Sequence, residues 1–200
     1  RMGAFAASIT QLATATSGLP ATAAARPGLV DVSLEKGRAL VTRVGNQSNL
    51  ILDPDLDSYY TMSLLLLRFP DLLDIVTGIA EKLRVQSLTG LPMSSEARTQ
   101  YFILEGRLDA IAKGIDADYG EAFAAATTPD LKAALEPSRV RLAGAIEGFR
   151  AASRAFVDGA GEPVLWSAVQ ARQVATLSML RQSWKDASAE MEVLLDTRVH

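Results

Sequence analysis

The chain has 200 residues, of which 48% are hydrophobic and 22% are charged, and its formal net charge is −3. These values are typical of a globular protein with a substantial core. A mildly acidic chain without a basic cluster lacks the electrostatic footprint of a nucleic-acid binder. The absence of cysteine excludes disulfides, thiolate metal sites and cysteine nucleophiles. The longest strongly apolar run, Leu64 to Leu67, is far shorter than the ~20 residues that span a membrane.

Helical patterns dominate the sequence from its first residues. Runs of β-branched residues with period-two alternation are missing, whereas Ala, Leu, Arg and Glu are abundant. A first helix is predicted over about residues 2–15. The segment 17–29 is rich in Ala, Pro and Gly, and we expect it to be a mobile linker.

A second helix is predicted over about residues 30–52, because small or apolar residues recur there at alternating spacings of three and four. These residues are Val30, Leu34, Gly37, Val41, Val44, Ser48 and Ile51. The small Gly37 and Ser48 allow a neighbouring helix to approach closely or leave a cavity in the core.

A third helix is predicted to start at Asp53, which is a good N-cap, with Pro54 at its first position. Its apolar seam consists of Met62, Leu65, Phe69, Leu72, Val76, Ile79 and Leu83. Pro70 lies off this seam and is expected to kink the helix rather than end it. Residues 90–92, Gly-Leu-Pro, are expected to close the helix.

Two further helices follow. Ser94 or Ser95 can cap a fourth helix, whose inward stripe is Ala97, Tyr101, Leu104, Leu108, Ile111, Ile115 and Tyr119. Residues 127–130 mark a restart, and Pro137 predicts a break before the inward face of a fifth helix. That face consists of Leu142, Ile146, Phe149, Ser153 and Phe156.

A last helix is predicted from about Val164 to the end of the chain. Its inward residues are Leu177, Leu180, Trp184, Ala187, Met191 and Leu194. Several predicted helices approach thirty residues, or roughly 45 Å at 1.5 Å per residue. Long helices with narrow seams and short connections predict an all-α fold, an elongated antiparallel bundle of about five to six helices. Residues 1–200 are expected to form a single domain.

Catalytic chemistry has little support in the sequence. The only histidine is His200, the final residue, and no GxSxG, HExxH or Walker-type glycine loop occurs. We therefore predict that the chain is not an enzyme and uses no cofactor. Trp166 and Trp184 are most simply core or interface residues.

Three alternating aspartates, Asp53, Asp55 and Asp57, match the spacing of the first three ligands of an EF-hand loop. The position that needs glycine is Ser58, and the position that needs glutamate is Leu64. The preferred interpretation is that Asp53 caps a helix while the next two carboxylates offset its dipole. A role beside a ligand site and calcium binding are the alternatives, and we predict no metal site.

The seams of the second and third helices turn polar at one junction. Because buried polar groups need partners, this junction is the best candidate for a small polar pocket. The candidate ligand-binding residues are Ser48, Asn49, Asp55, Ser58 and Tyr59, with Arg43 or Arg68 as charge partner. The expected ligand is a small polar or anionic solute.

The string from Ser48 to Tyr60, Ser-Asn-Leu-Ile-Leu-Asp-Pro-Asp-Leu-Asp-Ser-Tyr-Tyr, resembles one that is common in the sensor domains of bacterial methyl-accepting chemotaxis proteins and membrane sensor histidine kinases. The pattern Trp184, Ala187, Glu190, Leu194, Leu195 and Arg198 is similar to the family's helix that leads into the second transmembrane segment. The resemblance implies a four-helix-bundle sensor domain on the periplasmic face of the inner membrane. It also implies a homodimer that belongs to a longer, membrane-anchored receptor.

Two functions compete at this point. The first is an extracytoplasmic ligand-sensing domain that relays a signal through its C-terminal helix. The alternative is a structural or protein-interaction helical bundle without a small-molecule ligand. A ligand that binds only the native state would stabilise the first kind of protein and not the second.

Overall fold

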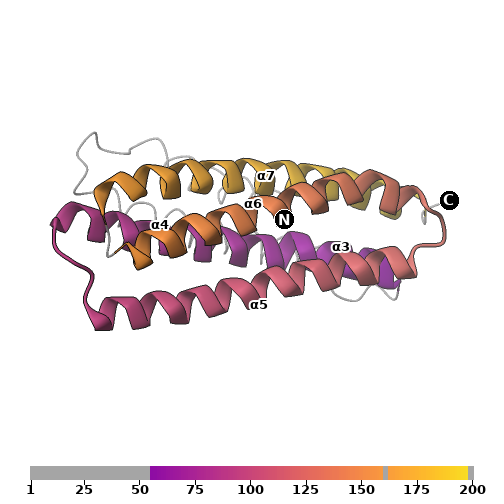
Figure 1. Ribbon diagram of the computed structural model, residues 1–200. Coiled ribbons are helices and arrows are strands. Elements are labelled where there is room, and N and C mark those ends of the chain that lie inside the picture. Colours follow the sequence, from indigo (N-terminus) through magenta and orange to yellow (C-terminus); the bar gives the residue numbers. More distant parts are fainter. Residues whose placement is uncertain (1–54, 160–161, 198–200) are drawn as a thin grey trace, which may run out of the picture. The chain divides into compact units, whose positions relative to one another are not determined.

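The computed structural model describes residues 55–159 and 162–197, which all belong to one compact unit of the chain. The described residues form helices and no strand, as the sequence predicted. Four long helices follow one another in alternating directions (Figure 1). The predicted total of five to six helices is not confirmed, because the helices expected over 2–15 and 30–52 lie outside the described residues.

The first long helix consists of three continuous pieces: α3 (Leu56–Ser63), the π-helical turn η2 (Leu64–Arg68) and α4 (Phe69–Thr89). The predicted start was wrong by two residues: the N-cap is Asp55 rather than Asp53, which itself lies outside the described residues. Pro70 does not end the helix, as predicted. Because proline has no N–H and its ring clashes with the carbonyl four residues back, a regular α-turn is unfavourable here. The backbone forms the wider turn instead, and Phe69 N–H donates to Leu64 O.

The remaining helices are α5 (Ser95–Ala125), α6 (Asp130–Asp158) and α7 (Pro163–Asp196). Gly90 ends α4 in the left-handed conformation, with φ of 64°, which glycine adopts at little cost. Ser94 caps α5 as predicted, since its hydroxyl accepts a hydrogen bond from Ala97 N–H at 3.1 Å.

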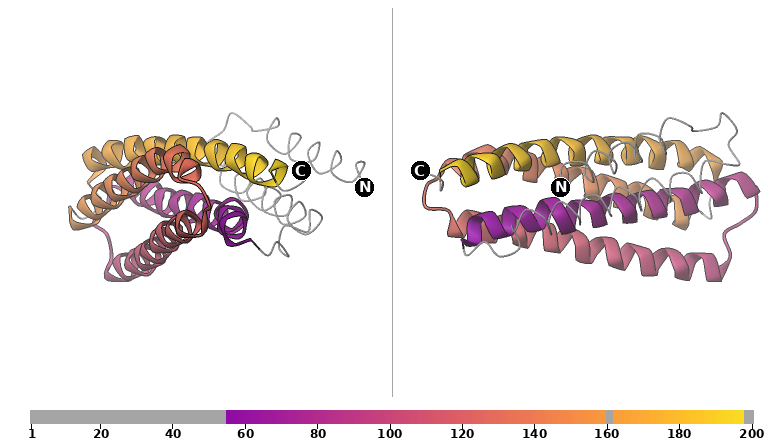
Figure 2. Two further views of the ribbon diagram at one scale, coloured as in Figure 1. Left: turned by 90° about the vertical axis from the view of Figure 1, so that its right-hand side faces the viewer. Right: turned by 180° about the vertical axis from the view of Figure 1, so that it is seen from behind.

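The helices pack as a bundle in which α6 lies along α7, α3 lies along α5, and α4 contacts both α5 and α7. The left view of Figure 2 looks along the bundle from one end, and the buried apolar residues of these helices form one core. Aromatic rings join three of them: the Phe69 ring centroid lies 6.3 Å from that of Tyr119 and 5.7 Å from that of Trp184. The predicted inward residues of α6 are all buried.

Two local predictions were wrong. Pro137 does not break the chain, because α6 runs through it from Asp130 to Asp158, with Pro137 on the exposed side. Leu65 is only partly buried, whereas Leu64 is fully buried. The π-turn causes this difference, because it separates Leu64 from the next core residue, Phe69, by five positions rather than four.

Among the described helices, none combines the length and the apolar character that a membrane crossing requires.

Candidate functional site

The start of α3 carries three of the predicted site residues. Asp55 is exposed and precedes the helix, and Ser58 is fully buried. The Ser58 hydroxyl donates to Asp55 O at 3.0 Å, within the first turn. Tyr59 is 40% exposed, and its ring packs edge-on against Tyr60 at a centroid distance of 5.2 Å. Thr61 is also buried, and its hydroxyl donates to Asp57 O at 2.7 Å. The first two turns of α3 therefore bring polar groups into the bundle.

Arg68, the fourth predicted residue that is described, pairs across the bundle with Asp118 of α5. Its Nε donates to Asp118 Oδ2 at 2.8 Å, and the Ser63 hydroxyl donates to the same oxygen at 2.6 Å. The Asp118 side chain is only 7% exposed, whereas that of Arg68 is 38% exposed. A buried carboxylate thus holds an arginine whose outer edge reaches solvent.

The lack of a side chain at Gly114 of α5 leaves room for the guanidinium of Arg68 in this ion pair. A Cβ at Gly114 would lie 2.6 Å from Arg68 Nη1, so the guanidinium occupies space that only glycine leaves. The hydrogen bond with Asp118 is the main cause that raises the pKa of Arg68, and burial opposes it. The charges of Asp118, Asp71 and Tyr59 raise the pKa of Arg68 further.

The structure brings the predicted residues together only in part. Arg43, Ser48 and Asn49 lie outside the described residues. Tyr59 and Arg68 are nine positions apart, or about 13 Å along the helix axis. None of the four described residues lines the cavities reported below. The proposed pocket at this junction therefore stays a prediction.

Sequence reasoning missed Asp118. The stripe of α5 at Tyr101, Leu104, Leu108, Ile111 and Ile115 continues in alternating threes and fours to position 118. A carboxylate at a seam position is the signal of a buried polar partner, because an unpaired buried charge is costly. The prediction named Tyr119 for this place, and both residues are buried.

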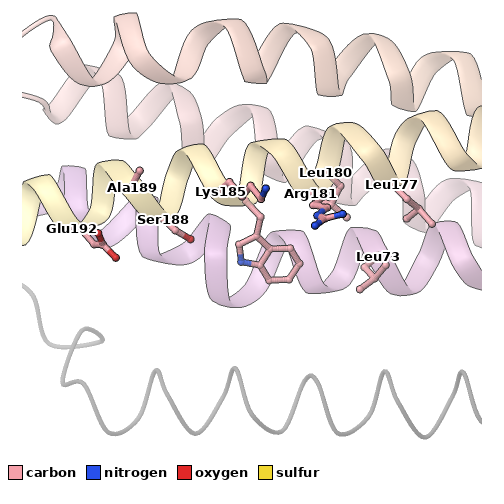
Figure 3. Close-up of a pocket in the computed structure, with 9 residues that line it drawn as sticks. Leu73, Leu177, Leu180, Arg181, Lys185, Ser188, Ala189 and Glu192 are labelled. Atoms are coloured by element: carbon pink, nitrogen blue, oxygen red, sulfur yellow. The ribbon is translucent and has the colours of Figure 1, made fainter. Parts of the chain in front are cut away.

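A groove of about 510 Å³ runs between α4 and α7 (Figure 3). It is lined by Leu73 of α4 and by Leu177, Leu180, Arg181, Trp184, Lys185, Ser188, Ala189 and Glu192 of α7. Its apolar side chains include one tryptophan, and two cations stand one turn apart on its edge. The sequence predicted Leu177, Leu180 and Trp184 as inward residues but gave no sign of a groove beside them.

A second cavity, of about 440 Å³, lies where α5 and α6 pack. Glu105 accepts hydrogen bonds from Arg150 at 2.7 Å and from Arg154 at 3.0 Å. Arg150 also pairs with Glu147 at 2.8 Å. Because carboxylates of the protein already pair with both arginines, this cavity is a weak candidate for an anion site.

A third polar region crosses the core between α5, α6 and α7. The hydroxyls of Tyr119 and Ser183 are buried close to each other, and neither has another hydrogen-bond partner among the described residues. Burial raises the pKa of the Tyr119 phenol well above its ordinary value, and the nearby Ser183 hydroxyl opposes that shift. Next to them, the Ser138 hydroxyl donates to Asp186 of α7.

Comparisons with protein-family models, curated proteins and solved structures give no match for this chain. No group of three or more acidic or histidine side chains that could hold a metal ion occurs within residues 55–159 and 162–197.

Proposed function

We propose that this chain is the extracytoplasmic ligand-sensing domain of a bacterial transmembrane chemoreceptor or sensor kinase. The observation that carries the proposal is the direction of the helices. The start of α3 and the end of α7 lie at the same end of the bundle, and the two helices contact each other (Figure 1). An antiparallel four-helix bundle brings these two ends together, and this is compatible with a domain whose flanking segments both lead to the same membrane. The string from Ser48 to Tyr60 supports the same class of protein.

The proposed site for the solute is the polar junction at this end of the bundle. Ser58, Tyr59 and the guanidinium of Arg68 contribute to it from the first long helix, and Asp55 contributes from its N-cap. Arg43, Ser48 and Asn49 complete the predicted set. Since Asp118 holds Arg68 from the buried side, the arginine would meet a polar or anionic solute with its side chain already ordered.

The proposed output is a shift of α7, which is the last helix and contacts α3, α4 and α6. A ligand shifts such an equilibrium only by its difference in affinity for the two packings, and a few kcal/mol is sufficient. The receptor would act as a homodimer on the periplasmic face of the inner membrane. The resemblance of the sequence to the sensor family supports this assembly and this location.

A thermal-shift screen of the 200-residue chain tests the sensing function. The screen contains organic acids, amino acids, nitrate and aromatic acids. One narrow class should raise the melting temperature, because a ligand that binds only the folded state stabilises it. The proposal is wrong if no class does so.

The location of the site needs a second measurement. With a ligand from the screen, Asn49→Ala and Ser58→Ala should each weaken binding in calorimetry. Ser95→Ala, at an exposed position of α5, is the control and should leave the affinity unchanged. Equal affinities for all four proteins would place the ligand elsewhere while leaving the sensing function intact.

One observation favours the alternative, a helical bundle that docks to other proteins. Large apolar side chains are exposed near the turn between α4 and α5, and Leu88 and Leu91 are 72% and 68% exposed. Exposed apolar clusters commonly mark protein contacts. A docking module would show no ligand-dependent stabilisation in the same screen, and Leu88→Ser with Leu91→Ser would abolish its self-association or partner binding.

A further inference from the structure

The groove between α4 and α7 has the size and lining of a small-molecule site. Its volume of about 510 Å³ lies within the range of roughly 300–1,000 Å³ that is usual for ligand pockets. Leu73 and Leu177 contribute apolar surface from its two sides (Figure 3). The groove does not include the polar junction at the start of α3, so an inference about it does not depend on the proposed sensing site.

The aromatic surface of the groove is held in place by the core. Trp184 is partly buried, and its ring lies 5.7 Å from that of the fully buried Phe69. A fixed tryptophan presents a rigid apolar face at little entropic cost. Such a face favours a flat apolar ligand over a flexible one.

The charge of the groove selects the sign of the ligand. Arg181 and Lys185 line it one helical turn apart, and neither makes an ion pair or hydrogen bond with another described residue. Like charges at this spacing repel each other. A bound anion would relieve that repulsion. Glu192, the one acidic side chain among the described lining residues, is seven residues beyond Lys185, or about 10 Å along the helix axis.

We propose that the α4–α7 groove binds an organic anion with a flat apolar body, of the aromatic carboxylate type. The ring system lies against Trp184 and the leucines, and the carboxylate meets Arg181 and Lys185. A second copy of the chain fits the groove less well. An interface with two-fold symmetry whose axis runs along the bundle would place these two cations against the same cations of the partner.

Calorimetry on the 200-residue chain tests the proposal with three matched probes. These are 1-naphthoate, the neutral 1-naphthalenemethanol, and acetate, which has the charge without the rings. 1-Naphthoate should bind, while acetate should show no binding. The neutral alcohol should bind about tenfold more weakly, because the charge pairs with the exposed Arg181 and Lys185 together are worth about that factor. Equal binding of acid and alcohol, or no binding of 1-naphthoate, would overturn the proposal.

Variants locate the site. Arg181→Gln with Lys185→Gln should reduce the affinity for 1-naphthoate about tenfold, to that of the alcohol. Trp184→Ala should abolish binding. The control is Arg107→Gln, which removes an exposed arginine from α5. Because the control removes one charge and the double variant removes two, a free-energy loss in the control of about half that in the double variant would show a net-charge effect and contradict the assignment.

Fluorescence shows whether the groove is open to a ligand. The chain has two tryptophans, so Trp166→Phe leaves Trp184 as the only reporter. Acrylamide should quench Trp184 in the free protein, and 1-naphthoate should protect it. If acrylamide hardly quenches Trp184 before 1-naphthoate is added, another part of the protein already fills the groove. Light scattering that shows a dimer broken by Arg181→Glu would identify a second copy as the occupant. Either result would overturn the proposal.

Discussion

At the scale of single residues, Tyr101 shows that the core contains hydroxyl groups without partners. The side chain is 1% exposed, and its hydroxyl has no hydrogen-bond partner among the described residues. Leaving a buried polar group unsatisfied costs about 1–3 kcal/mol. We therefore expect Tyr101→Phe to raise the free energy of unfolding by about 1 kcal/mol in urea titrations. Tyr59→Phe, at an exposed position, should leave it unchanged. A loss of stability in Tyr101→Phe would show that the hydroxyl has a partner.

The same residue predicts a pH dependence in alkaline solution. Burial raises the pKa of Tyr101 to about 12, above the value of about 10 in an unfolded chain. Between these two values the folded state binds the proton and the unfolded state releases it. Stability from this residue is therefore complete below pH 10 and is lost as the pH rises to 12. The difference in unfolding free energy between wild type and Tyr101→Phe should widen over this interval. A constant difference would contradict the shifted pKa.

Asp118 tests the buried ion pair. It accepts hydrogen bonds from Ser63 and Arg68, and its side chain is almost inaccessible. Asp118→Ala should lower the free energy of unfolding by about 2 kcal/mol, the range for hydrogen bonds to a charged group. Asp116→Ala is the matched control on the same helix, because that carboxylate is 63% exposed. It should change stability by less than about 1 kcal/mol. Equal losses of unfolding free energy in both variants would show that the buried ion pair with Arg68 contributes no more stability than an exposed one.

At the scale of helices, Pro137 is the clearest local conflict between sequence and structure. It lies inside α6, where it removes one backbone hydrogen bond and crowds the carbonyl of Ala133. Pro137→Ala should therefore raise the free energy of unfolding by about 2 kcal/mol, measured by urea denaturation. Ala134→Gly, at an exposed position of the same helix, should lower it by about 1 kcal/mol. A destabilised Pro137→Ala would mean that the proline has a packing role.

Helical seams were the part of the fold that the sequence predicted well. The predicted stripes of α5, α6 and α7 contain core residues because alternating spacings of three and four follow the α-helical period. The prediction failed where the period changes. The sequence predicted Leu65 on the seam, whereas the structure buries Leu64 more completely. Nothing in four consecutive leucines reveals the wider turn that causes this. The predicted break at Pro137 was wrong because the packing of α6 in the bundle outweighs the poor helix propensity of proline.

The candidate site was less predictable because its partners are far apart in the sequence. Arg68 was named from its place near an apolar seam, but Asp118 is fifty positions away. Choosing that partner requires knowing that η2 packs on α5, and one sequence contains no such pairing information. The groove beside Trp184 is equally hidden, because it depends on how α4 and α7 meet.

At the scale of the whole molecule, the proposed sensing function predicts a movement of α7. The chain has no cysteine, so pairs of spin labels can be introduced cleanly. Labels at Val140 of α6 and Val193 of α7, which are both exposed, report on these helices. A ligand identified by the thermal screen should shift their mean distance by about 1–2 Å or more in pulsed electron paramagnetic resonance. The control pair, Lys113 of α5 and Val140, should stay unchanged. A ligand that stabilises the protein without changing either distance would argue against signalling through α7.

The π-turn has a consequence for the length of the chain. Between Leu64 and Phe69 the helix advances five residues in one turn, so it holds one residue more than an α-helix needs. Removing Leu67, which is exposed, would leave Leu64 and Phe69 one α-turn apart and keep both halves facing the core. A related protein with another residue in place of Pro70 could therefore be one residue shorter here and keep the same bundle. A sequence alignment that forbids gaps inside helices would then be out of register by one residue for every position on one side of the turn.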